Sequence, residues 1–227
     1  MDYIEKLDNI LLSYKAAADF FQAYEKKGFK SWINKLCPEI DKCVNQQQIH
    51  PYHIYDVMTH LLVSVEAMNS QTLGMDLNIR RMLAYVMFLH DIGKPECHRR
   101  TMKDGQVRDS FQGHQVVSAR IASKILPKLN FTDSEVKIMT ELIYKHDIFM
   151  FIKLFKTNNP YWRQLSPDVI KSEISELNEV GDGMTLMKYL IMIGRSDKLA
   201  QNPEMTADST KLLNRMEKML KDIEKEK

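Results

Sequence analysis

Apolar residues recur every three or four positions along most of this chain, a spacing that places them on one face of an α-helix. The alternating pattern typical of a half-buried β-strand is rare. Local signals agree, because TDSE at residues 132–135 matches a capping box and Ser166-Pro167 is typical of a helix start. We predict an all-α fold with a helix after Ser166 and helices over residues 3–26, 30–37, 54–69, 78–90, 114–127, 133–146, 184–200 and 205–226.

Two stretches lack the helical period and are predicted to be loops. The first is NQQQIHPYH, residues 45–53. The second is a long stretch from Gly93 to Gly113, which is rich in glycine and charged residues. We find no repeat, no low-complexity segment and no clear linker, so residues 1–227 are interpreted as a single all-α domain.

Composition and charge narrow the class of protein. Hydrophobic residues make up 44% and charged residues 27% of the 227 residues, which is ordinary for a soluble globular protein. The formal net charge of +2 lacks the strong basic footprint of DNA-binding proteins. No apolar run suits a membrane-spanning helix, and no signal peptide is recognisable. The three cysteines fit no zinc motif, so we expect reduced thiols, a cytoplasmic location and neither DNA nor membrane as a partner.

The stretch FLHDIGKP, residues 88–95, places ionisable side chains at the end of an apolar helix face. Met82, Val86 and His90 follow one another at steps of four, so His90 continues a buried stripe. Asp91 comes next, and a buried carboxylate is costly unless it is paired or binds a cation. Similar apolar stripes elsewhere in the chain carry His60, His114, His146 and Asp197.

Taken alone, each of these histidines is more often a core or capping residue than a metal ligand. The apolar stripes of one small helical domain converge, however, so their polar members should meet near its centre. Four histidines and two aspartates meeting there would be badly desolvated without a cation. Imidazole and carboxylate donors suit Mn, Fe, Co, Ni, Zn or Mg, and the lack of cysteine argues against a closed structural zinc site. We therefore predict one or two divalent metal ions as the cofactor.

The ordered set of histidines and aspartates carries a resemblance to a known family. The segments HPYHIYDVMTHLL, FLHDIGKP, FQGHQVVSARIASKIL, LIYKHD and GRSDKLAQN resemble the HD-domain metal-dependent phosphohydrolase superfamily. They are most similar to the HD domain appended to bacterial CCA-adding tRNA nucleotidyltransferases, over about residues 50–203. No Gly-Ser followed by paired carboxylates lies upstream, and residues 1–45 are too few for a polymerase head, so we expect a free-standing HD domain.

The resemblance implies a fold and a set of ligands. The fold would be a compact HD-domain helical bundle about residues 50–203, with a helical extension over residues 1–45 and a C-terminal helix over residues 204–227. The first metal would be held by His60, His90, Asp91 and Asp197. A second metal would be held by His114 and His146, with Asp91 bridging the two ions.

The activity implied by the resemblance is hydrolysis of a phosphoester by a metal-activated water. Asp91 would act as the bridging or orienting carboxylate of the metal site. Lys94 would reach toward a substrate phosphate, although a lysine after a helix end is also commonly solvated. Arg99 and Arg100 could gather an anionic substrate or simply lie in solvent. Lys198 is expected to face outward, and Asp147 could orient His146 from behind or equally face solvent. The implied substrates are 2′,3′-cyclic phosphates, phosphomonoesters of nucleotides or an RNA end.

Two other classes of function remain open from the sequence. The chain could be a non-catalytic module that binds a nucleotide or an RNA end through the same fold. It could also be an assembly protein in which a metal serves only stability. In that case the amphipathic first and last helices would pack on a partner or on a second copy in a homodimer, rather than on the core of their own domain.

Overall fold

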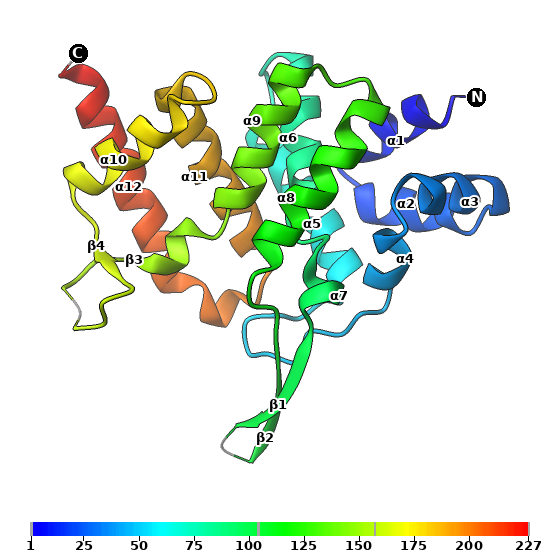
Figure 1. The fold of residues 1–227 in the computed structure, drawn as a ribbon, viewed down its shortest axis with the longest axis horizontal. Coiled ribbons are helices and arrows are strands. Elements are labelled where there is room, and N and C mark those ends of the chain that lie inside the picture. Colours follow the sequence, from blue (N-terminus) through cyan, green and yellow to red (C-terminus); the bar gives the residue numbers. More distant parts are fainter. Residues whose placement is uncertain (1, 104, 157, 227) are drawn as a thin grey trace.

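The computed structural model describes residues 2–103, 105–156 and 158–226, and it is built almost entirely of helices (Figure 1). A central group of helices carries the site. It consists of α5 (Val57–Gln71), α6 (Leu77–Leu89), α8 (His114–Ile125), α9 (Asp133–Lys145) and α11 (Gly183–Leu199). Within this group α5 packs against α6 and α11, while α9 packs against α6 and α8. The all-α prediction is confirmed.

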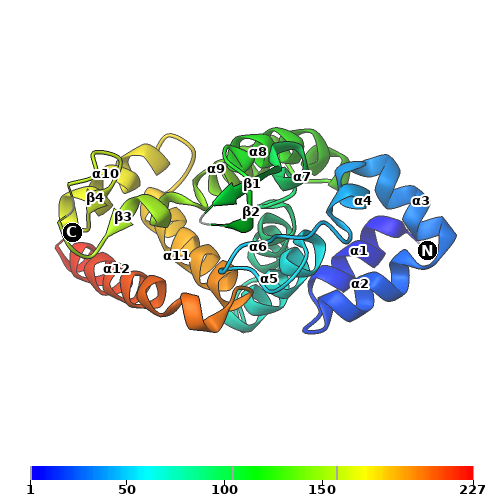
Figure 2. The ribbon, with the colours of Figure 1, turned by 90° about the horizontal axis from the view of Figure 1, so that it is seen from below.

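Two smaller groups of helices flank the centre on opposite sides (Figures 1 and 2). The N-terminal group consists of α1 (Tyr3–Leu11), α2 (Ala16–Tyr24), α3 (Lys27–Leu36) and α4 (Glu39–Cys43). The C-terminal group consists of α10 (Pro167–Leu177) and α12 (Ala207–Lys225), joined to the centre through α11. Short 3-10 turns follow or precede these helices, namely η1 (Leu126–Leu129), η2 (Ile148–Phe151) and η3 (Pro203–Met205).

The helix starts follow from side chains that accept hydrogen bonds from exposed backbone N–H groups. Asp56 accepts from the backbone of Thr59 at the start of α5. The predicted capping box forms at α9, where the side chains of Thr132 and Glu135 each accept a hydrogen bond from the backbone N–H of the other residue. Ser166 caps α10 ahead of a proline in the first turn, as predicted. The helices therefore begin where local chemistry places them.

The prediction of one helix over residues 3–26 is wrong, because the chain breaks between α1 and α2. The Ser13 hydroxyl donates to the Asp19 carboxylate at 2.6 Å and accepts from the Lys15 backbone at 3.0 Å. Such local bonding by serine competes with the helical backbone. The apolar stripe survives the break because both helices turn it toward the same core, to which Leu7, Leu11 and Phe20 contribute.

The prediction of an irregular loop from Gly93 to Gly113 is also wrong. The short helix α7 (Lys94–Cys97) is followed by an antiparallel hairpin of β1 (Arg99–Lys103) and β2 (Gln106–Ser110). The hairpin projects from the body of the molecule (Figure 1). Its strands carry charged residues on both faces, so the alternation that marks a half-buried strand is missing. A second strand pair, β3 (Ile152–Lys153) with β4 (Arg163–Gln164), is parallel and very short.

The first and last helices pack on the protein's own core. Helix α1 contacts α2 and α6, and α12 contacts α10 and α11. The apolar face of α12 is buried through Leu212, Leu213, Met216, Leu220 and Ile223. Within the described ranges, no helix is both long enough and apolar enough to cross a membrane.

Candidate metal centre

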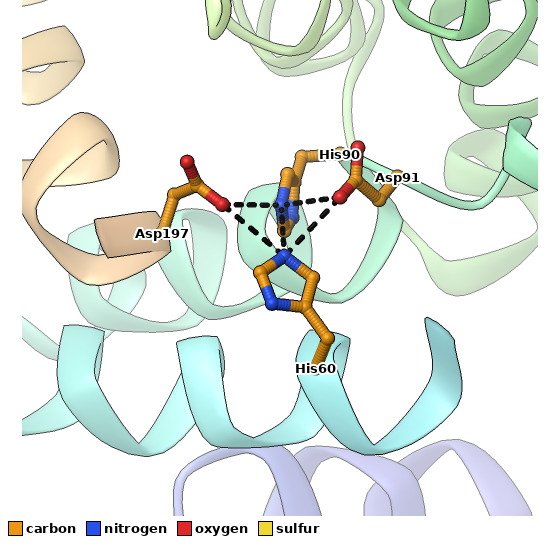
Figure 3. A group of neighbouring side chains, drawn as sticks. All are labelled: His60, His90, Asp91 and Asp197. Atoms are coloured by element: carbon orange, nitrogen blue, oxygen red, sulfur yellow. Dashed lines mark hydrogen bonds and ion pairs between the residues drawn. The ribbon is translucent and has the colours of Figure 1, made fainter. Parts of the chain in front are cut away.

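Four of the predicted ligands converge from three helices of the central group (Figure 3). His60 lies in α5 and Asp197 in the last turns of α11. His90 ends α6 as its C-cap, and Asp91 follows it. All four residues are buried, and each offers one ligand atom within 4.8 Å of the other three. The structure thus brings together side chains that are up to 137 positions apart.

The atoms face one another closely. The Nε2 atom of His60 lies 3.3 Å from that of His90, 3.2 Å from Asp91 Oδ2 and 3.1 Å from Asp197 Oδ1. His90 Nε2 lies 3.3 Å from Asp91 Oδ2 and 3.7 Å from Asp197 Oδ1. Two imidazole nitrogens and two carboxylate oxygens therefore surround one point.

A second group uses the other oxygen of the same aspartate. His114 Nε2 lies 2.9 Å from Asp91 Oδ1, and His146 Nε2 lies 3.5 Å from it. The two Nε2 atoms are 3.3 Å apart. His114 opens α8 after Gly113, whose φ of 85° is easy for glycine, and His146 is the C-cap of α9. Asp91 thus stands between two donor groups, as a bridging carboxylate does.

The other ring nitrogen of each histidine is already used. The Nδ1 atoms of His60, His90, His114 and His146 lie 2.6–3.1 Å from the backbone carbonyl oxygens of Ala200, Met87, Phe111 and Ile143, respectively. A carbonyl oxygen only accepts, so each Nδ1 carries the proton. In its neutral form each ring therefore presents an Nε2 lone pair to the centre, and this arrangement orients imidazoles for metal binding.

This donor set fits a divalent cation. The lone pairs of His60 and His90 point at each other at 3.3 Å, and those of His114 and His146 do the same. Neither contact is favourable between neutral rings unless a positive charge, either a proton or a metal ion, lies between them. The buried oxygen Asp91 Oδ1 also lacks a regular hydrogen bond within the described part of the chain. A cation at each group would satisfy these atoms, and nitrogen and oxygen donors of this kind suit several divalent metals.

The electrostatics of the groups agree with this interpretation. Burial favours the neutral form of Asp91, but Lys94 and the neighbouring histidines outweigh it and hold its pKa well below the usual range. The same balance, with Lys198 and His60 as the main opposing groups, lowers the pKa of Asp197. Burial lowers the pKa of His146, yet Asp147 and Asp91 overcome it and raise the value to about 9. The two aspartates are therefore charged and ready to coordinate.

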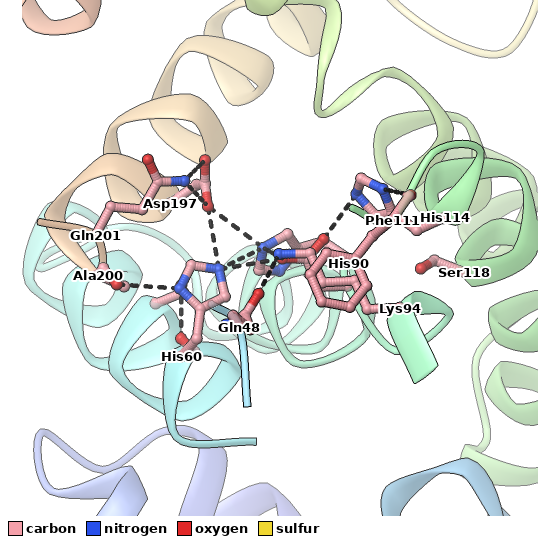
Figure 4. Close-up of polar contacts among 12 residues, drawn as sticks. Gln48, His60, His90, Lys94, Phe111, His114, Ser118, Asp197, Ala200 and Gln201 are labelled. Atoms are coloured by element: carbon pink, nitrogen blue, oxygen red, sulfur yellow. Dashed lines mark hydrogen bonds and ion pairs between the residues drawn. The ribbon is translucent and has the colours of Figure 1, made fainter. Parts of the chain in front are cut away.

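Lys94 is buried and bound to the centre. Its Nζ lies 2.6 Å from Asp91 Oδ2 and donates to Gln48 Oε1 at 2.8 Å (Figure 4). The ring of Phe111 lies beneath the ammonium at 5.4 Å. The solvated alternative for this lysine is therefore wrong. Gln48 was not among the predicted site residues. It lies in a polar segment predicted to be a loop, and nothing there distinguishes a glutamine of the site from one in solvent.

Further residues hold Asp197 and the second group. Lys198 Nζ lies 2.8 Å from Asp197 Oδ2, and Gln201 donates to both oxygens of Asp197 at 3.0–3.1 Å. The expectation that Lys198 faces outward is wrong. Asp147 Oδ2 lies 3.2 Å from His114 Nε2, whereas its other oxygen is 3.6 Å from His146 Nε2. Asp147 thus lies on the ligand side of both rings rather than behind His146.

Arg99 and Arg100 lie on β1, away from these contacts. Arg100 donates to both oxygens of Asp109, at 2.8 and 3.0 Å, and Arg99 is exposed. Among the described residues, neither arginine forms a hydrogen bond or ion pair with the six predicted ligands. Their predicted role in binding substrate stays a prediction.

Comparison with known proteins gives a distant and partial likeness. No protein-family model matches the chain. A bifunctional uridylyltransferase/uridylyl-removing enzyme of Gluconobacter oxydans is 29% identical over 127 residues, which are 50% of this chain and 12% of that protein. An A-adding tRNA nucleotidyltransferase of Deinococcus radiodurans is 30% identical over 95 residues, 42% of this chain and 20% of that protein. The chain is thus similar to a minor part of two nucleotidyltransferases.

Proposed function

We propose that this protein is a metal-dependent phosphohydrolase acting on a nucleotide-like phosphoester, either a 2′,3′-cyclic phosphodiester or a phosphomonoester. The observation that carries the proposal is the position of Asp91, whose two oxygens face two separate groups of imidazole donors. Paired divalent sites are well suited to phosphoryl chemistry because the charge of the reacting phosphate is shared between them. The sequence resemblance to HD-domain phosphohydrolases supports the same reaction.

The similar proteins favour a nucleotide as substrate. One relative is named for removing a uridylyl group, which is a nucleotide joined through its phosphate, and the other for adding a nucleotide to tRNA. We therefore expect a small phosphorylated partner, a nucleotide or an RNA end. DNA and membranes are not expected partners.

The residues of the site have distinct roles in this proposal. His60, His90, Asp91 and Asp197 would hold one cation, and Asp91, His114 and His146 the other. A bound divalent cation lowers the pKa of a water molecule and offsets charge on the phosphoryl oxygens. Water adds to phosphorus, the bond to the leaving oxygen breaks, and that oxygen takes up a proton.

Lys94 would bind the phosphate. Its ammonium has three N–H donors, and Asp91 and Gln48 engage two of them. In this proposal the third would donate to an oxygen of the substrate, next to the shared carboxylate. A lysine held by two buried partners is ordered before substrate arrives, and this lowers the entropic cost of binding.

Hydrolysis by metal-stripped and reloaded protein tests the proposal. The substrates are 2′,3′-cyclic AMP, bis-p-nitrophenyl phosphate and p-nitrophenyl phosphate, with Mn, Ni, Co and Mg returned one at a time. We expect turnover only with metal, and at least a 100-fold loss in Asp91→Asn, since both donor groups lose their shared charge. Asp168→Asn, an exposed change in the first turn of α10, is the matched control.

The same experiment discriminates the non-catalytic alternative. If no metal restores turnover of any ester, the phosphohydrolase proposal fails for these substrates. Binding of 2′,3′-cyclic AMP that is lost in Asp91→Asn would then favour a nucleotide-binding module.

A further inference from the structure

A groove of about 420 Å³ lies between strand β2 and the loop of residues 45–56, beside the candidate metal centre. Its volume falls in the range of roughly 300–1,000 Å³ that is common for small-molecule sites. Side chains that could bind a ligand line it from both walls: Gln48, His50, His53 and Tyr55 from the loop, and Gln106 and Arg108 from β2.

The groove adjoins the metal centre through two of these residues. Gln48 accepts from Lys94 at 2.8 Å, and Lys94 in turn contacts Asp91. The ring of His53 meets the ring of His60 edge-on, with centroids 5.7 Å apart. A ligand in the groove would therefore contact Gln48 and His53, which in turn contact Lys94 and His60 of the centre.

The walls of the groove are fixed by hydrogen bonds. Asp109 on β2 accepts from the backbone of Ile49 at 2.9 Å and donates its own N–H to the Ile49 carbonyl at 2.8 Å. On the other side, Asn202 after α11 donates to the backbone carbonyls of Tyr52 and Pro51 at 2.9 and 3.0 Å. The Gln48 amide also donates to the Tyr55 carbonyl at 3.1 Å. The loop is therefore ordered before a ligand binds, which favours binding.

The lining has the chemistry of a nucleotide site. Within the described part of the chain, no acidic side chain is among those that line the groove. Burial, followed by the charges of Arg108 and Lys94, lowers the pKa of His50, so two positive charges lie near this part of the groove. The ring of His50, which lines the groove, stacks on the ring of Tyr52 outside the lining with centroids 5.4 Å apart. The amides and imidazoles of the lining offer hydrogen bonds. Aromatic surfaces, amides and positive charge together bind bases and phosphates.

One polar atom of the groove lacks a partner. The Nδ1 atom of His53 is buried and makes no hydrogen bond within the described residues. An unsatisfied buried polar atom destabilises a fold, and such atoms are common where a ligand completes the site. A ribose hydroxyl or a base nitrogen would supply the missing partner.

We propose that this groove binds the nucleoside part of the substrate, with His53 as the hydrogen-bonding and specificity-determining residue and Arg108 as a second contact. This inference rests on the proposed function for its reacting phosphate, since the groove is linked to Lys94 and Asp91 through Gln48. It adds that the protein selects nucleotides over simple phosphate esters.

Substrate selectivity tests the inference. The value of kcat/KM is measured for 2′,3′-cyclic AMP and for bis-p-nitrophenyl phosphate, which has no nucleoside. We expect His53→Phe, which keeps the ring but loses the hydrogen bond, to lower the first value about tenfold and leave the second within twofold. Arg108→Ala should act in the same direction. His53→Asn, which can place a polar atom near the position of Nδ1, should restore most of the loss.

Controls and a binding measurement make the outcomes distinct. Arg215→Ala removes the same charge from the exposed surface of α12 and should change neither value. Calorimetry with adenosine, which has no phosphate, reports on the groove alone. Equal losses for both esters, or none in either groove variant, would overturn the inference while leaving the phosphohydrolase proposal intact. If neither ester is hydrolysed, adenosine binding that His53→Phe weakens supports the groove, and no adenosine binding overturns it.

Discussion

A single carboxylate organises the site at the scale of one residue. Asp91 places Oδ2 near His60, His90 and Lys94, and Oδ1 near His114 and His146. Buried charge of this kind is tolerated only where opposite charge surrounds it. Lys94 supplies part of that charge from within the protein, and a divalent cation would supply the rest.

Replacement of Lys94 by methionine separates substrate binding from metal binding. Lys94→Met keeps most of the side chain's length but removes the ammonium that sits 2.6 Å from Asp91 Oδ2. We expect metal affinity to be equal or higher, because a competing cation is gone, and kcat/KM for 2′,3′-cyclic AMP to fall about 10- to 100-fold. Calorimetric metal titration and steady-state kinetics measure the two effects. Unchanged kinetics would remove Lys94 from the reaction.

Close packing against α8 explains why a glycine, Gly93, occupies the turn after His90 and Asp91. A Cβ on Gly93 would lie 2.7 Å from the Ser118 nitrogen and 2.8 Å from the His114 oxygen. The Gly93 N–H also donates to the Ser118 hydroxyl at 2.9 Å. The turn between α6 and α7 therefore presses directly on α8, which carries a ligand of the second group.

Substitution of this glycine by alanine should be costly. Gly93→Ala should lower the unfolding free energy by about 1–3 kcal/mol, the usual cost of overpacking, and should weaken metal binding by moving His114. Thermal unfolding measures the first effect and metal titration the second. Gly181→Ala is the matched control, because its Cβ would meet only side-chain carbons at 3.2 Å or more. A melting temperature equal to that of the control would contradict the steric argument.

At the scale of elements, the β1–β2 hairpin is joined to the loop of residues 45–56 through Asp109. This buried carboxylate receives hydrogen bonds from Arg100 and from the backbone of Ile49, and His98 lies 2.9 Å away. The hydrogen bonds from Arg100 are the largest cause of the low pKa of Asp109, which lies far below its usual value. The stability that ionised Asp109 contributes is therefore fully present at pH values above the ordinary carboxyl pKa. It is lost as the pH falls through the lowered pKa of Asp109.

Removal of this charge should loosen the hairpin without unfolding the helices. Asp109→Asn should speed tryptic cleavage at Arg99, Arg100 and Arg108 by about tenfold, because local opening exposes the strands. The far-ultraviolet circular dichroism should stay unchanged. Timed proteolysis at neutral pH measures the effect, with Asp168→Asn as the control. Cleavage at the control's rate would mean that Asp109 does not hold the hairpin.

At the scale of the whole molecule, the centre joins helices from distant parts of the chain. Ligands come from α5, the ends of α6 and α9, the start of α8, and α11. A cation that binds only this assembled arrangement stabilises the folded state by mass action. Binding of such a cation would therefore couple the stability of the entire helical core to metal.

Metal binding should depend on pH in a defined direction. The pKa of His146 is about 9, so its ring is protonated at pH 7 until a cation displaces the proton. We expect the apparent metal affinity to rise with pH from 6 to about 9 and level off there, with proton release at pH 7. Calorimetry with Mn in buffers of different ionisation enthalpy measures this release. Chelation should lower the melting temperature, and an affinity that is flat with pH would contradict the ligand assignment.

The sequence by itself determined the helical class and the residues that could chelate. Helical periodicity is local, so the stripes that carry His60, His90 and Asp197 could be identified from spacing alone. Cap positions were equally local, and Ser166 and Thr132 start helices as predicted. The break at Ser13 and the hairpin of charged strands were missed, because side-chain bonding and solvated strands leave no periodic signal.

Only the tertiary structure decided which of these side chains meet. The division of the ligands into two groups that share Asp91 was implied by the family resemblance and not by spacing, whereas the link from Lys94 to Gln48 and the bond from His60 to the Ala200 carbonyl were not predicted. All three join distant segments. The last two span 46 and 140 positions. Spacing along one helix cannot specify such pairs, because they depend on how separate helices pack and which loops close over them. The groove beside the centre likewise exists only where the hairpin, the loop of residues 45–56 and the end of α11 are held together.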